Sequence, residues 1–83
     1  MPSSQTNQPT LERALATARG LKPGSWESVE ALALLALDTA GTPEALALLE
    51  AASEAAARLK SGTWESARAL VWLARAEREV GQR

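Results

Sequence analysis

The chain repeats itself, and this repetition limits what it can fold into more than any other feature of its 83 residues. The segment 21–36 (LKPGSWESVEALALLA) aligns with the segment 59–74 (LKSGTWESARALVWLA) at an offset of 38 residues. Without gaps, residues 11–36 match residues 49–74 at 14 of 26 positions. Matches of alanine and leucine are common in this composition, but the shared Leu-Lys-x-Gly-x-Trp-Glu-Ser is specific. The chain is therefore predicted to contain two copies of one structural unit.

Each unit is predicted to be a helix, a short glycine-containing turn and a second helix. Alanine, leucine, arginine and glutamate favour helices, whereas phenylalanine and tyrosine, which favour strands, are absent. We expect an all-α fold made of two tandem helix–turn–helix repeats, over about 10–41 and 42–81. Together they form a single four-helix domain over 10–81, either an antiparallel bundle or a short open stack.

Helix boundaries follow from capping residues. Thr10 is the expected N-cap of the first helix, and the polar residues 1–9 are predicted to be a disordered tail. Ser25 and Thr63 precede the two tryptophans and are expected to cap the second and fourth helices, over about 26–40 and 64–80. Thr42 is the expected cap of the third helix, since it precedes a proline and a glutamate, and this helix extends to about residue 60.

The distribution of apolar residues predicts which helix is central. The segment Ala31–Leu37 is apolar on every side of a helix, so the helix over 26–40 should contact the other three. The helix over 43–60 has one apolar stripe, and its opposite side has Glu50, Glu54 and Arg58 at intervals of four residues. That charged ladder is interpreted as a solvent-facing surface and not as a binding site, since such pairs add only ~0.2–0.5 kcal/mol each.

Trp26 and Trp64 occupy equivalent positions at the starts of two helices. A tryptophan beside a cap can stack on a ligand, but because both copies keep it we favour a hydrophobic plug that fixes the preceding turn. The neighbouring Glu27 and Glu65 could be taken for a catalytic carboxylate pair. They lie in first helical turns, where the helix dipole favours acids in any case.

The helix over 64–80 contains the candidate binding residues. Its expected core side comprises Ala67, Leu70, Leu73 and Ala74, with Val71 and Val80 at the edges, and its polar side comprises Glu65, Arg68, Arg75 and Glu79. Trp72 lies in the middle of the polar side and is equivalent to Leu34. In a stack of repeats the next copy would cover position 34, which would leave Trp72 at the open end. Two interpretations are equally supported: Trp72 stacks on Arg68 and Arg75 by cation–π contact, or these three residues form a partner-binding anchor.

Composition argues against an enzyme. The chain has no cysteine and no histidine, which excludes disulfides, thiolate or imidazole metal ligands, and Cys–His or Ser–His nucleophile pairs. Catalysis would depend on carboxylates and lysines, and no pattern brings Asp38, Lys22 and Lys60 into one pocket. We therefore predict no catalytic residue, no metal, no cofactor and no small-molecule substrate.

Charge and hydropathy exclude two further classes of partner. The net charge of −1 disfavours nucleic acid, because a binder of duplex DNA needs several Lys or Arg residues on one face. The longest uncharged apolar run, Ala31–Leu37, is far shorter than the ~20 residues that span a bilayer. The N-terminus has no basic and apolar signal segment. A cytoplasmic protein without membrane contact is expected.

The stretch 26–60 resembles a tetratricopeptide-type repeat. The residues that carry the resemblance are Trp26 early in the first helix, Ala33 near its middle, Gly41 in the turn, and Ala45 and Ala52 in the second helix. The period of 38 departs from the family's period of about 34. The resemblance implies protein–protein binding or self-association, as a homodimer, without chemistry. The alternative is a small helix-turn-helix regulator that binds nucleic acid, although acids stand where a recognition helix needs basic and amide side chains.

Overall fold

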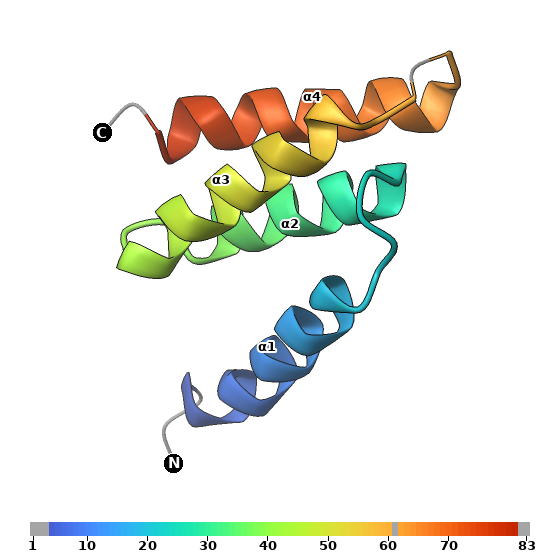
Figure 1. Ribbon diagram of the computed structural model, residues 1–83. Helices are drawn as coiled ribbons and strands as arrows, with labels where there is room; N and C mark the ends of the chain where they lie inside the picture. Colours follow the sequence, from blue (N-terminus) through green and yellow to red (C-terminus); the bar gives the residue numbers. More distant parts are fainter. Residues whose placement is uncertain (1–3, 61, 82–83) are drawn as a thin grey trace.

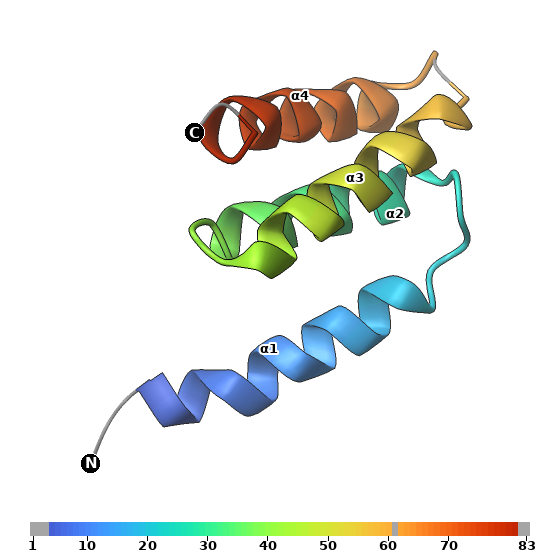
Figure 2. The same ribbon diagram turned by 60° about the vertical axis from the view of Figure 1, so that its left-hand side comes forward.

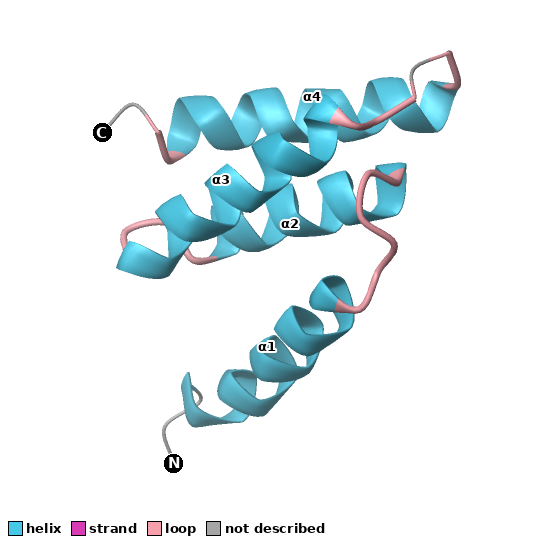
Figure 3. Ribbon diagram, in the orientation of Figure 1, coloured by secondary structure: helices cyan, strands magenta, loops and turns pink. Residues whose placement is uncertain are grey.

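A computed structural model describes residues 4–60 and 62–81, and these residues form four helices and no strand (Figure 3). The helices are α1 (Ser4–Arg19), α2 (Trp26–Asp38), α3 (Pro43–Ala57) and α4 (Trp64–Glu79). Successive helices reverse direction, so α2 and α4 run the same way (Figure 1). The all-helical prediction is confirmed for the described residues.

Helix α2 is central, as its apolar sequence predicts. It makes its most extensive contacts with α3 and α4 and smaller ones with α1, and α3 also contacts α4. The α2 residues Val29, Ala33 and Ala36 are completely buried. Alanines in α3 and α4, such as Ala52, Ala69 and Ala76, are also fully buried, and such small side chains allow helix axes to approach closely.

The first helix begins earlier than predicted. Residues 4–9 belong to α1 and not to a disordered tail, and Thr10 lies inside this helix instead of capping it; residues 1–3 of the expected tail lie outside the described residues. Pro9 is also inside α1, where it cannot donate a hydrogen bond to the carbonyl of Gln5. Only the opening turn precedes Pro9, so the disruption falls on that turn and the helix continues. Figures 1 and 2 show α1 diverging from the other three helices towards its N-terminus.

Ser25, Thr42 and Thr63 are the N-cap residues of α2, α3 and α4, as predicted, and two of them cap through the side chain. The backbone N–H of Ser28 donates to the hydroxyl of Ser25 over 3.2 Å, and that of Ser66 donates to Thr63 over 3.1 Å. The side chain of Thr42 accepts no capping hydrogen bond from α3, and its hydroxyl donates to the carbonyl of Thr39 over 2.7 Å. Proline at the first position of α3 is confirmed.

The turns before α2 and α4 have glycines with positive φ. Gly24 has φ of 85° and Gly62 has φ of 118°, in the region that L side chains rarely adopt. A Cβ atom on Gly24 would lie 3.0 Å from the Cβ atom of Arg58, so this turn is also packed closely against the end of α3. No helix of the described residues is long and apolar enough to cross a membrane.

Candidate functional site

Helix α4 buries only part of the face predicted for it: Leu73 and Val80 are buried as expected, and most of the other predicted core residues are not. Its buried residues are Ser66, Ala69, Leu73, Ala76 and, at its end, Val80. Ala67, Leu70 and Ala74 were expected in the core, and all three are exposed. The reason is that α4 has two apolar stripes, and the stripe containing the fully buried Ala69 and Ala76 is the one that fits against the rest of the molecule.

Trp72 does not project from a polar surface at the open end. Its side chain is half-buried and packs against the core, whereas the equivalent Leu34 is 39% exposed, the reverse of the expectation. The guanidinium carbon of Arg75 lies 5.3 Å from the centroid of the Trp72 ring. The stacking of Arg75 on Trp72 is therefore present, while Arg68 stacks elsewhere.

Arg68 joins α4 to α2. Its guanidinium carbon lies 5.1 Å from the ring centroid of Trp26 and 4.5 Å from that of Trp64, and its Nε donates to Oε1 of Glu30 over 2.8 Å. The three residues predicted to bind a partner thus fall into two groups, with Trp72 and Arg75 in one and Arg68 in the other. Trp26 is half-buried as a plug should be, but Trp64 is 65% exposed and is not one.

The contacts of Arg68 also join equivalent positions of the two sequence copies. Glu30 and Arg68 are separated by 38 residues, and so are Trp26 and Trp64. Helices α2 and α4 therefore lie side by side, in the same direction and in register (Figure 1).

An apolar surface remains uncovered on α4. It consists of four exposed residues, which we name the α4 open face: Ala67, Leu70, Val71 and Ala74. Leu70 is 40% exposed and Val71 is 63% exposed. The equivalent residues of α2 are all buried: Val29, Leu32, Ala33 and Ala36. Sequence reasoning missed this surface because it assigned the same residues to the core. The alignment at an offset of 38 residues contained a signal for it. The apolar residues of α2 recur in α4, but among the described residues no helix follows α4 to cover them.

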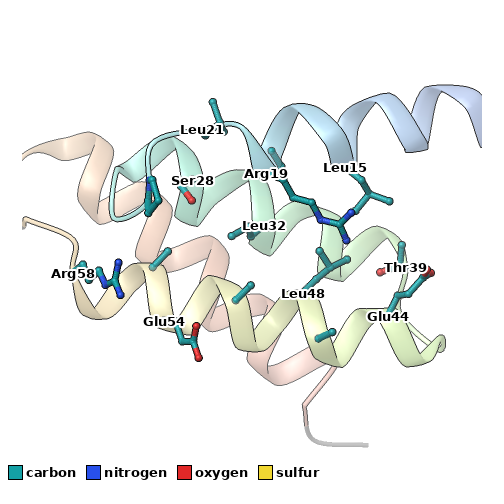
Figure 4. A pocket seen from close by; sticks show the side chains of 15 residues that line it. Leu15, Arg19, Leu21, Ser28, Leu32, Thr39, Glu44, Leu48, Glu54 and Arg58 are labelled. Atoms are coloured by element: carbon teal, nitrogen blue, oxygen red, sulfur yellow. The ribbon is translucent and has the colours of Figure 1, made fainter.

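A cleft of about 330 Å³ lies between α1, α2 and α3 (Figure 4). Its walls include Leu15 from α1, Leu32 from α2 and Leu48 from α3, and its charged side chains are Arg19, Glu44, Glu54 and Arg58. The two arginines and the two glutamates give the cleft no preference for one sign of ligand charge. In the described part of the chain, no group of three or more acidic, cysteine or histidine side chains could hold a metal ion.

Comparisons of the chain with protein-family models, with curated proteins and with solved structures find no match.

Proposed function

We propose that this chain is a non-enzymatic helical-repeat module that binds protein, either another partner or a second copy of itself, through the α4 open face. The module is built from two tandem helix–turn–helix units stacked in the manner of tetratricopeptide-type repeats. The matched caps at Ser25 and Thr63, the glycine turns before α2 and α4, and the in-register pair of Glu30 and Arg68 support this arrangement.

The observation that carries the proposal is the contrast in exposure between equivalent residues. Leu32 is 9% exposed in α2, whereas Leu70 is 40% exposed in α4, and Ala33 is completely buried, whereas Val71 is 63% exposed. Burial of apolar surface is favourable by about 25 cal/mol of free energy for each Å² removed from water. A contiguous apolar strip on a helix, next to the exposed Trp64, has the chemistry of a surface that another protein covers.

Substitution at the centre of the strip tests this function. Val71→Lys places a charge on the α4 open face, and Leu46→Lys makes the same change on α3 at a residue that is 58% exposed, so the two variants are matched. Tagged wild type and both variants are used to capture proteins from extracts that also contain the untagged chain, and bound proteins are identified by mass spectrometry.

We expect wild type and Leu46→Lys to retain the same protein, and Val71→Lys to lose it. Equal capture by all three proteins would contradict the assignment of the α4 open face. Circular dichroism of both variants serves as the folding control. Because both sites are exposed, the added lysine should leave the helices folded.

A further inference from the structure

We infer that the protein which covers the α4 open face is a second copy of this chain, with α4 packed antiparallel against α4 of its partner. This inference rests on the proposed function and adds the identity of the partner. The exposed residues Trp64, Ala67, Val71, Ala74 and Arg78 recur at alternating intervals of three and four residues along α4. Such spacing places them in one row along a helix and is the spacing by which helices pack side by side.

The first sequence copy indicates that the occupant is a helix. Leu32, the equivalent of Leu70, lies at the cleft that α2 forms with Leu48 and Ala51 of α3. Helix α2 makes its most extensive contacts with α3, a helix rich in alanine and leucine. The small side chains Ala67 and Ala74 on either side of Val71 allow another helix to approach α4 equally closely. The surface therefore has the shape and chemistry for a second apolar helix.

A head-to-tail arrangement of two copies does not provide such a helix. At the 38-residue offset α1 is the equivalent of α3, and it would have to take the place of α3 on the α4 face of the neighbouring copy. The α3 residues Leu48 and Ala55 are buried, whereas their equivalents in α1 are the exposed Thr10 and Thr17. The hydroxyl of Thr17 already donates to the carbonyl of Arg13 over 2.7 Å. The apolar residues of α1, Leu11, Leu15 and Ala18, already pack against the core of their own copy. The α4 open face of one copy is therefore matched by the α4 open face of another.

The row of residues on α4 is complementary to itself when reversed. Val71 lies at its midpoint, so a two-fold axis there places Val71 against its own symmetry mate and Ala67 against Ala74 of the second copy. The same axis places the exposed Trp64 beside Arg78 of the second copy, at both ends of the interface. Arg68 already stacks on Trp64 and leaves this residue 65% exposed, so it has a free surface for a second guanidinium.

The interface is small. One pair of four-turn helices buries less than the ~1,600 Å² of a standard protein–protein interface. The dimer should therefore dissociate on dilution in roughly the micromolar range. Light scattering over a dilution series should show wild type and Leu46→Lys changing from dimer to monomer together, and Val71→Lys remaining monomeric throughout.

A cysteine placed on the two-fold axis tests the geometry. The chain has no cysteine, so Val71→Cys introduces the only thiol, and Leu46→Cys is the matched control on α3. Under mild oxidation at concentrations that favour the dimer, Val71→Cys should form a disulfide-linked dimer at least tenfold faster than Leu46→Cys. Equal rates for the two variants would overturn the antiparallel α4 pairing.

A wild type that remains monomeric at all concentrations would overturn the second copy as partner. If capture of a different protein still depended on Val71, the proposed function would stand without this inference. If Val71→Lys changed neither the captured proteins nor the molecular mass in solution, both the proposed function and this inference would be wrong.

Discussion

Helices α2 and α4 align position for position at an offset of 38 residues, yet α2 is buried on two sides and α4 on one. Both helices begin with Trp-Glu-Ser after a hydroxyl cap, and both bury the serine, Ser28 or Ser66. They differ further along, where four buried residues of α2 correspond to the four residues of the α4 open face. The apolar pattern of a helix therefore sets how much of its surface can be buried, while the neighbouring helices determine which part of that surface is buried.

The largest expected effect comes from placing a carboxylate at equivalent positions. Ala33 is completely buried and Val71 is 63% exposed. Ala33→Asp should cost roughly 3–5 kcal/mol, as for other uncompensated buried charges, and this is comparable to the whole stability of a small domain. Val71→Asp should leave the monomer within about 0.5 kcal/mol of wild type. Urea unfolding followed by circular dichroism measures both, and similar losses in the two variants would remove the contrast between α2 and α4.

A second pair of substitutions, in α2 and α4, compares how well equivalent positions tolerate a larger side chain. Ala36 is completely buried in α2, and its equivalent Ala74 is exposed in α4. Ala36→Leu should lower the free energy of unfolding by about 1–3 kcal/mol through overpacking. Ala74→Leu should change it by less than about 0.5 kcal/mol at concentrations where the chain is monomeric. If α4 pairs with α4 of a second copy, Ala74→Leu should also alter dimer dissociation, whereas Ala36→Leu should act on folding alone.

The capping residues and the central position of α2 were predicted correctly from the sequence. Capping depends on the residue and its immediate neighbours, so Ser25, Thr63 and the proline that opens α3 could be assigned from the sequence, and the central position of α2 followed from its apolar girdle. Periodicity could not choose between the two stripes of α4, because alanines occur in both and are compatible with burial or exposure. Which stripe of α4 is buried depends on how its side chains pack against α2. The same packing places Arg68 over Trp26 and leaves Trp72 half-buried.

The N-caps of α2 and α4 are a feature that the two helices share, so their removal should have equal effects. Ser25→Ala and Thr63→Ala each remove the acceptor for one backbone N–H, from Ser28 and Ser66 respectively. Each should therefore cost about 1 kcal/mol of stability, and the two losses should be similar. Thermal unfolding of the single variants measures this. A cap that matters in only one helix would show that the two turns are not equivalent.

The smallest effect is expected for the link between the helices. Arg68 and Glu30 form an ion pair of 2.8 Å with side chains 38% and 18% exposed. The coupling energy between Arg68→Gln and Glu30→Gln in a double-mutant cycle should be about 0.2–1 kcal/mol and should fall as salt is added. A coupling that is zero at low salt would indicate that α2 and α4 are held in register by apolar packing without this pair.

Thiol labelling at one equivalent pair tests most directly whether α2 and α4 differ as described. Ala36→Cys and Ala74→Cys make the same small change in a chain that otherwise has no cysteine. At concentrations where the chain is monomeric, the Ala74 variant should react with a thiol reagent almost as fast as it does when unfolded. The Ala36 variant should react only as the protein opens, slower by a factor of 100 or more, on the order of a 3 kcal/mol opening. Equal rates for the two cysteines in the native protein would contradict the claim that this face is buried in α2 and open in α4.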